Sequence, residues 1–255
     1  MTGQLAELGL TLQFILRTFR TLFSTRGNMR MILEQTALIS YRSISTVSSA
    51  GLFVGAILVL QFNLILSRYD AQSLLGGLNT SAIIREIGPL LISFLLAGKV
   101  GAFTAAELGT MRVTEQIDAI ECLGTDPIQF LIVPRFVAIM ISSIILLTLG
   151  LLVSIAGSMV IASSLYGINF LTYAQTIPRF TDLWTLFCGF FKSGLYALIV
   201  AGVSCTQGFY ATGGARGVGR AVTKAAIYTN FYIVIANFVS SHFLDLLFQL
   251  KETFR

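Results

Sequence analysis

Residues 136–165 contain no charged side chain and read FVAIMISSIILLTLGLLVSIAGSMVIASSL. A helix needs about 20 residues to cross the hydrocarbon core of a bilayer, so this stretch predicts a membrane-spanning helix. The whole chain of 255 residues is 55% hydrophobic and 11% charged, with a mean hydropathy of +0.81. A soluble domain carries about 25% charged residues. The composition therefore excludes soluble, disordered, collagen-like, coiled-coil and disulfide-stapled classes, and predicts an all-α integral membrane protein with a single domain over residues 1–255.

Apolar segments of spanning length recur along the chain. The five predicted spans are 44–66, 83–106, 136–165, 183–210 and 226–249. Residues 5–25 place apolar side chains at helical spacing but are too polar to cross, which predicts an amphipathic helix in the membrane interface. Gly51 and Gly55 form a GxxxG motif on the first span, a pattern that permits another helix to approach closely. The polar stretches 67–82 and 166–182 are predicted to be loops.

An acidic segment, residues 107–127, lies between the second and third spans. Its charged side chains are Glu107, Arg112, Glu115, Asp118, Glu121 and Asp126. So many carboxylates exclude the hydrocarbon, and Gly124 with the Asp126-Pro127 pair would end a short exposed helix. A docking surface for a soluble partner and a solvated connecting helix both explain this composition.

The distribution of Lys and Arg predicts the orientation of the chain. Ten of these residues fall on the side of the N-terminus: Arg17, Arg20, Arg26, Arg30, Arg42, Arg112, Arg135, Arg216, Arg220 and Lys224. Five fall on the other side: Arg68, Arg85, Arg179, Lys251 and Arg255. Because positive residues concentrate on the cytoplasmic side, we expect a cytoplasmic N-terminus, and five spans put the C-terminus on the opposite side of the membrane.

Sequence signatures of catalysis and of metal or nucleotide binding are missing. The chain has one histidine, its three cysteines show no CxxC spacing, and it contains neither GxSxG nor GxxxxGK[ST]. We therefore expect no enzyme activity, no metal, no cofactor in this chain and no nucleic-acid partner. The glycine-rich basic segment 211–225 is interpreted as a tight turn with a basic face toward lipid headgroups.

Charged residues inside the predicted spans are costly, and they usually point to a partner or a cavity. Lys192 lies about nine residues into its span, too deep to reach the interface easily, so a carboxylate partner or a polar cavity is expected. Structural pairing and a role in substrate binding are equally compatible with this position. Arg85 and Glu86, at the start of the second span, are also compatible with ordinary interfacial anchoring.

Several motifs together resemble one family of membrane proteins. They are REIGP at 85–89, AGKVGA at 97–102, AELGTMRVTEQIDA at 106–119, Asp126-Pro127, Pro134-Arg135 and GVGRAVT at 217–223. This set resembles the MlaE/YrbE permeases, the membrane subunits of ABC-type phospholipid transporters that work with MCE proteins. The resemblance extends over nearly the whole chain.

The resemblance implies a multi-pass protein of the bacterial inner membrane with a periplasmic C-terminus. It further implies a homodimer that moves phospholipid between the inner and outer membranes and maintains outer-membrane lipid asymmetry. It also implies a cytoplasmic ABC ATPase that carries the ATP and Mg, a periplasmic MCE-domain protein and a STAS-like accessory subunit. The acidic segment resembles a coupling helix, with ATPase-coupling residues Glu107, Arg112, Glu115, Asp118 and Glu121. The implied lipid-binding residues are Leu58, Gln61, Ile65, Leu66, Tyr69, Arg85 and Glu86.

The intramembrane polar residues Lys192 and Asn237 also match family positions. Lys192 matches a charged position of the fourth span, whereas Asn237 stands where some members carry an aspartate. The partner of Lys192 is therefore open among Glu86, Asn237 and a lipid phosphate. Two alternatives for the protein's function are a stand-alone channel or ion-coupled carrier, with Lys192, Glu86 and His242 on a polar pathway, and a non-transporting membrane scaffold.

Overall fold

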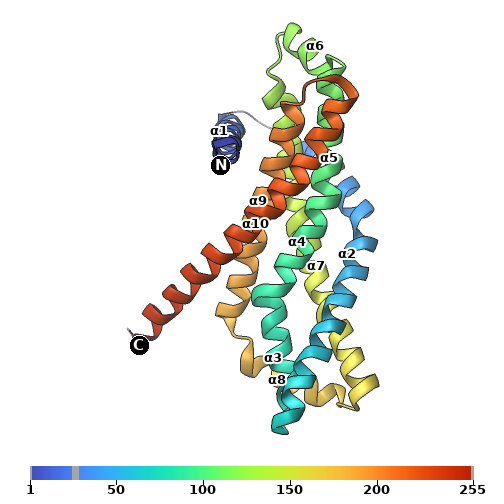
Figure 1. Ribbon diagram of the computed structural model, residues 1–255, viewed down its shortest axis with the longest axis vertical. Coiled ribbons are helices and arrows are strands. Elements are labelled where there is room, and N and C mark those ends of the chain that lie inside the picture. Colours follow the sequence, from blue (N-terminus) through green and yellow to red (C-terminus); the bar gives the residue numbers. More distant parts are fainter. Residues whose placement is uncertain (1, 25–28, 254–255) are drawn as a thin grey trace. The chain divides into compact units, whose positions relative to one another are not determined.

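The computed structural model describes residues 2–24 and 29–253, and within these ranges the chain forms helices joined by short turns, with no strand. The α-helices are α1 (Thr2–Ser24), α2 (Met29–Leu66), α3 (Leu75–Ala82), α4 (Gly88–Leu96), α5 (Ala102–Val113), α6 (Gln116–Cys122), α7 (Val133–Tyr166), α8 (Phe170–Phe180), α9 (Leu183–Phe209) and α10 (Gly214–Thr253). Short 3-10 turns form η1 (Ser67–Tyr69) and η2 (Gln72–Leu74), and π-helical turns form η3 (Ile83–Ile87), η4 (Ala97–Gly101) and η5 (Ile128–Ile132) (Figure 1). Residue 25 of the predicted amphipathic helix, together with Arg26 and Arg255, lies outside the described residues.

Within residues 2–24 and 29–253, five helical segments are long and apolar enough to cross a membrane. In chain order they are Met29–Tyr69, Gln72–Val113, Ile128–Tyr166, Leu183–Phe209 and Gly214–Leu250. The prediction of an all-α membrane protein with five spans and a separate N-terminal helix is confirmed. The charged residues that interrupt the second span do not break it, because Arg85 and Lys99 are accommodated in the π-helical turns η3 and η4.

The chain divides into two compact units, which are described separately. The first unit comprises Met1–Ser43, Phe94–Ser143 and Ala197–Ile233. The second unit comprises Ile44–Ser93, Ile144–Tyr196 and Val234–Arg255.

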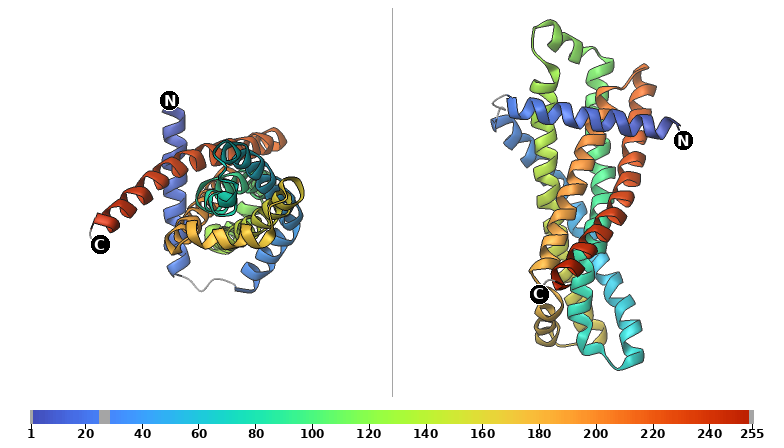
Figure 2. Two further views of the ribbon diagram at one scale, coloured as in Figure 1. Left: turned by 90° about the horizontal axis from the view of Figure 1, so that it is seen from below. Right: turned by 90° about the vertical axis from the view of Figure 1, so that its left-hand side faces the viewer.

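In the first unit, α1 lies across α7, α9 and the first part of α10 (Figure 2). Phe14 is buried, with its ring centroid 5.5 Å from that of Phe209 in α9. Phe19 packs edge-on against Phe136 of α7 at 5.6 Å. Leu12 remains 52% exposed on the opposite side of the helix. The exposed residues of α1 include the basic Arg17 and Arg20 as well as apolar Leu12 and Leu16, and such a mixture fits a position in the membrane interface.

In the second unit, the GxxxG motif of α2 packs against α7 of the same chain. A Cβ atom at Gly55 would collide with the carbonyl oxygen of Ser154, and one at Gly51 would lie 2.6 Å from the carbonyl oxygen of Gly150. The absence of side chains at these positions therefore lets the two helix backbones touch. This motif is used within one chain.

The prediction that residues 67–82 and 166–182 are loops is wrong, because α3 and α8 form there and pack against each other. Gly77 allows the close approach, since a Cβ atom there would lie 2.5 Å from the carbonyl oxygen of Thr176. Tyr173 is buried and its hydroxyl bonds to Ser158 at 2.8 Å and to Asn79 Nδ2 at 3.0 Å. These hydrogen bonds give the buried amide nitrogen of Asn79 and the buried hydroxyl groups of Tyr173 and Ser158 a partner inside the protein.

Candidate functional site

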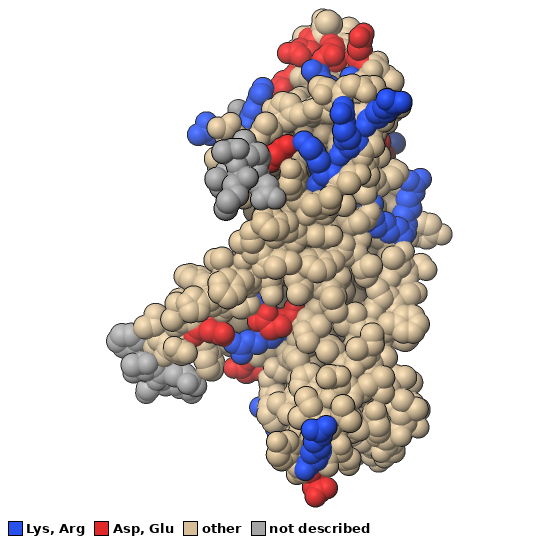
Figure 3. Space-filling view, in the orientation of Figure 1, with Lys and Arg blue, Asp and Glu red and all other residues tan. Residues whose placement is uncertain are grey.

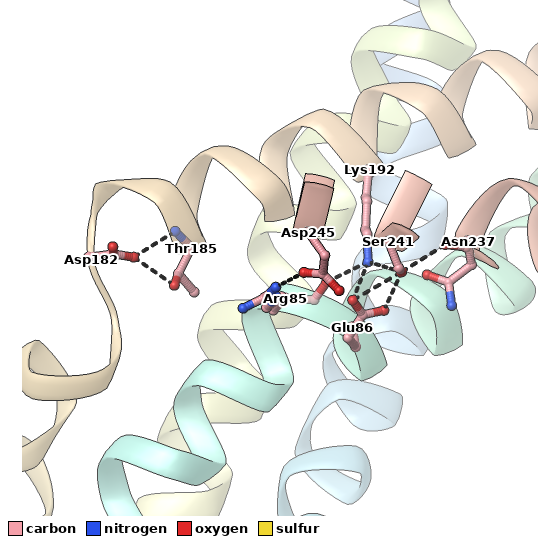
Figure 4. A network of polar contacts seen from close by, with 8 residues as sticks. All are labelled: Arg85, Glu86, Asp182, Thr185, Lys192, Asn237, Ser241 and Asp245. Atoms are coloured by element: carbon pink, nitrogen blue, oxygen red, sulfur yellow. Dashed lines mark hydrogen bonds and ion pairs between the residues drawn. The ribbon is translucent and has the colours of Figure 1, made fainter. Parts of the chain in front are cut away.

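A network of charged and polar side chains lies among the apolar helices of the second unit (Figure 4). η3 contributes Arg85 and Glu86, α9 contributes Lys192, and α10 contributes Asn237, Ser241 and Asp245. We refer to these six residues as the polar network.

Pro89 explains why the helix is irregular where Arg85 and Glu86 lie. A proline has no N–H to donate to the carbonyl four residues earlier, and its ring clashes with that carbonyl. The affected carbonyl belongs to Arg85, and it accepts a hydrogen bond of 3.0 Å from Lys192 Nζ. A π-helical turn and a side-chain donor thus replace a regular helical bond, which an apolar surrounding would otherwise leave unsatisfied.

Lys192 is the most buried charged residue of the network, with 1% of its side chain exposed. Its Nζ lies 2.6 Å from Oε1 of Glu86 and donates to Ser241 Oγ at 2.8 Å. Together with the bond to the Arg85 carbonyl, these contacts use all three donors of the ammonium group. Of the three partners left open by the sequence, the structure selects Glu86.

Asn237 has a different role from the one that its position suggested. Its Oδ1 accepts a hydrogen bond of 2.6 Å from the hydroxyl of Tyr196, and its backbone carbonyl accepts one of 2.7 Å from Ser241 Oγ. Asn237 therefore acts on Lys192 only through Ser241. The hydroxyl of Ser241 is also 3.0 Å from Oε2 of Glu86. Ser241 therefore contacts the ammonium group of Lys192, the carboxylate of Glu86 and the backbone carbonyl of Asn237.

A second ion pair joins Arg85 to Asp245, with side-chain exposures of 35% and 50%. The two basic and two acidic side chains balance each other's charge, which lowers the cost of placing them among apolar helices. Part of the network reaches the surface, where Figure 3 shows a small mixed group of charges in an otherwise uncharged area.

Asp245, Ser241 and Tyr196 are members of this site that the sequence interpretation missed. A signal was present, because positions 237, 241 and 245 are spaced by four residues and share one face of α10. An acid inside an apolar segment also requires a positive partner, and Arg85 and Lys192 were the available candidates.

The predicted lipid-binding residues of α2 and η1 separate into two groups. Gln61, Ile65 and Tyr69 are exposed, with Leu58 partly buried on the same side of the helix. Leu66, which was predicted to contact lipid, differs from this group. It is 9% exposed and belongs to a buried cluster with Val59, Leu75, Ala162 and Tyr173. One step along an α-helix turns the side chain by about 100°, and here Ile65 is exposed whereas Leu66 packs into this cluster.

The predicted coupling segment lies in the first unit and forms the end of α5, a tight turn and α6. Arg112 pairs with Asp118 across the turn, and the buried Arg135 donates to Oε1 of Glu107 at 2.8 Å. Glu115, in the turn, adopts a left-handed conformation with φ of 61°. These contacts fix the segment to its own unit.

The tip of this segment presents a mixed acidic and apolar surface. Ile117 is fully buried and packs α6 against its own unit. Glu115 and Glu121 are exposed, and Leu123 is 83% exposed. Of the five predicted coupling residues, Glu107, Arg112 and Asp118 thus make intrachain ion pairs, whereas Glu115 and Glu121 face outward.

The five spans, the charged network inside them and the braced acidic helix outside them define a multi-pass membrane protein of the transporter-permease class. Residues 32–243 match the family described as Permease MlaE, and the chain belongs to this family. It is 39% identical to a probable ABC transporter permease protein of Synechocystis over 88% of this chain and 86% of that protein. A probable ABC transporter permease protein of Rickettsia conorii is 34% identical, over 83% and 82% of the two chains. The chloroplastic protein TRIGALACTOSYLDIACYLGLYCEROL 1 of Arabidopsis thaliana is 34% identical, over 84% of this chain and 61% of that protein.

Proposed function

We propose that this permease subunit moves phospholipid between the inner and outer membranes and thereby maintains outer-membrane lipid asymmetry. It acts as a homodimer, with a cytoplasmic ABC ATPase that carries ATP and Mg, a periplasmic MCE-domain protein and a STAS-like accessory subunit. The observation that carries the choice of substrate is the polar network, because a charge-balanced group among apolar helices suits a molecule with a charged head and apolar chains. The Arabidopsis relative is named after trigalactosyldiacylglycerol, a glycerolipid, and this name favours a lipid as the substrate.

Arg85 is the network residue best placed to meet a lipid phosphate. Its guanidinium is partly exposed and bonded to the half-exposed Asp245, so a phosphate oxygen could take the place of that carboxylate. Lys192 is fully enclosed and holds Glu86 and the Arg85 carbonyl in place instead. In this proposal Arg85 binds the headgroup and Lys192 positions it.

An apolar cavity beside the network suits an acyl chain. It has a volume of about 100 Å³ and is lined by Ile84, Leu151, Leu152, Leu186 and Phe190. Ile84 is the neighbour of Arg85 in η3, so the cavity begins next to the proposed headgroup contact. A methylene chain gains free energy on leaving water in proportion to the apolar area that it buries, and such a lining supplies that area.

Energy is supplied by the partner ATPase, through the exposed tip formed by Glu115, Glu121 and Leu123. A segment braced by the Arg112–Asp118 and Glu107–Arg135 pairs would transmit a displacement of α6 to α5 and α7. This transmission is a population shift driven by differential contact, and it requires no chemistry in this chain. In this proposal the segment lies on the cytoplasmic side, which the excess of Lys and Arg on the side of the N-terminus supports.

The decisive experiment is a mild detergent purification of the chain from its own host at native expression, with mass spectrometry of the accompanying proteins and lipids. We expect an ABC ATPase, an MCE-domain protein and phospholipid. An Arg85→Gln variant should retain the proteins and lose phospholipid. Recovery of the chain alone, without phospholipid, under conditions that preserve other complexes would overturn the proposal and favour a channel, a carrier or a scaffold.

A further inference from the structure

The turn between α9 and α10, in the first unit, encloses a polar cavity that the proposed transport mechanism does not use. Gly213 and Gly214 adopt positive φ values of 91° and 64°, which reverse the chain direction tightly. Gly217 lies against the carbonyl of Thr212, where a Cβ atom would collide. These glycines form a tight turn, and Thr212 and Gly217 of this turn line a cavity of about 270 Å³.

The lining of this cavity is rich in hydrogen-bond donors. Gln207, Arg220 and Lys224 contribute side-chain donors, and Tyr210 contributes a hydroxyl. The guanidinium of Arg220 makes a long contact of 3.5 Å with the Thr212 carbonyl, which leaves most of its donors available to a ligand. Figure 3 shows basic side chains gathered over the first turns of α10.

A carboxylate of the same chain already uses part of this donor set. Glu7 of α1 accepts 2.8 Å from Lys224 Nζ and 2.9 Å from Gln207 Nε2. Partial burial alone would raise the pKa of Glu7, but the hydrogen bonds from Lys224 and Gln207 and the charge of Lys224 outweigh it and hold the pKa below its ordinary value. The surroundings of the cavity thus favour a negative charge.

The position of α1 indicates the depth of the cavity in the membrane. An amphipathic helix that exposes both apolar and basic side chains, as α1 does with Leu12, Leu16, Arg17 and Arg20, lies at the level of the lipid headgroups. Because Glu7 on this helix reaches Lys224 and Gln207, the cavity opens at that level. A headgroup phosphate of the adjacent leaflet is therefore the anion within reach.

We propose that this cavity, between the end of α9 and the start of α10, binds the phosphate of an anionic phospholipid and is a lipid site separate from the polar network. Arg220 is the main contact, and Lys224 and Gln207 complete the site. Glu7 competes with the lipid for Lys224 and Gln207. The inference requires only that the chain spans a membrane and does not depend on the proposed transport activity.

The test uses a fluorescent reporter at the cavity in the full-length chain. Trp184 is the single tryptophan, so a Trp184→Phe, Phe209→Trp variant carries its only tryptophan next to Tyr210 of the cavity and leaves every lining residue unchanged. The variant is reconstituted in phosphatidylcholine nanodiscs containing increasing fractions of spin-labelled phosphatidylglycerol or spin-labelled phosphatidylcholine. We expect the anionic lipid to reach half-maximal quenching at a lower fraction, by about tenfold, as expected of charge-assisted hydrogen bonds.

Two substitutions on the same helix distinguish a built site from diffuse attraction. Arg220→Gln removes the main contact, whereas Arg216→Gln removes one exposed charge a turn earlier, outside the cavity lining. Arg220→Gln should abolish the preference for the anionic lipid and Arg216→Gln should retain most of it. Glu7→Gln should strengthen the preference, because Lys224 and Gln207 are released.

Three results would overturn the proposal: no preference in the parent reporter, equal losses in Arg220→Gln and Arg216→Gln, or displacement of the anionic lipid by millimolar glycerol 3-phosphate. The last result would assign the cavity to a soluble phosphate compound. Circular dichroism melting of each variant in the same phosphatidylcholine nanodiscs verifies that the fold is retained.

Discussion

The ammonium nitrogen of Lys192 lies 2.6 Å from Oε1 of Glu86, and 1% of the lysine side chain is exposed. A buried charge in an apolar bundle is stable only when it is paired and its remaining donors are satisfied. Ser241 and the carbonyl that Pro89 leaves free complete this requirement. The ion pair therefore joins η3 to α9, and the hydroxyl of Ser241 adds α10 of the same unit.

Removing either partner of this pair should destabilise the protein, and removing both should restore part of the loss. We expect Glu86→Gln to lower the free energy of unfolding by about 3 kcal/mol, since it leaves the buried Lys192 without its counter-charge. Lys192→Met should cost less, because the Glu86 side chain that it leaves is 37% exposed and is screened by solvent. The double variant should lose less than the sum of the two. Unfolding in detergent, analysed as a double-mutant cycle, measures the coupling. The exposed Arg30–Glu34 pair provides the control, because its removal should change stability little. Additive losses at Lys192 and Glu86 would contradict the pairing.

The contact of α2 with α7 predicts a difference between two glycines of the second unit. Gly55→Ala should lower the melting temperature, because the new Cβ atom meets the Ser154 carbonyl. Gly194→Ala should leave it unchanged or raise it, because nothing lies within 4 Å of a Cβ atom there and alanine favours a helix by up to about 1 kcal/mol. Equal effects of the two substitutions would show that the glycine packing is not required.

The left-handed conformation of Glu115 predicts an unusual tolerance for glycine. Glu115→Gly should preserve or increase stability, whereas Glu115→Val should lower it by about 1–2 kcal/mol, because a branched side chain clashes in this conformation. Chemical unfolding of the two variants is the measurement. A more stable valine variant would indicate that the turn adopts another conformation.

The acidic and apolar tip predicts which substitutions uncouple the partner ATPase. Glu121→Lys with Leu123→Asp should abolish co-purification of the ATPase while the permease still inserts, because both side chains face outward. Exchanging Arg112 and Asp118 should retain co-purification, since the exchange preserves their ion pair. Undiminished ATPase recovery with the Glu121 and Leu123 substitutions would rule out this surface as the docking site.

Docking of α1 should depend on pH through Glu7. The pKa of Glu7 in the folded protein lies below its value in the unfolded chain, so its contribution to stability is present above the unfolded pKa and is lost as the pH falls through the folded pKa. We expect protease cleavage within α1 to increase below about pH 4, near the ordinary range of a glutamate. Glu7→Gln should show weaker docking at neutral pH and no such transition. A transition that persists in Glu7→Gln would assign the effect to other carboxylates.

The sequence by itself determined the number of spans, the separate N-terminal helix and the family. Span length follows from bilayer thickness, so an uncharged stretch such as 136–165 predicts its own structure without knowledge of any neighbour. The family motifs between residues 85 and 135 are local strings, and they can be read in the same way.

Tertiary packing determines which charged side chains pair and which side of each helix is buried. Lys192 had three possible partners, and only the packing of η3 and α10 against α9 selects Glu86. Polar side chains of 67–82 indicated a loop, but α3 forms there and packs against α8, where Tyr173 accepts a hydrogen bond from the buried Asn79. Hydrophobicity requires only that each residue leave water or face lipid, and it does not specify which distant side chain it meets. Contacts between residues far apart in the chain make that choice, as they did for Leu66 in its buried cluster and for Asp245 beside Arg85.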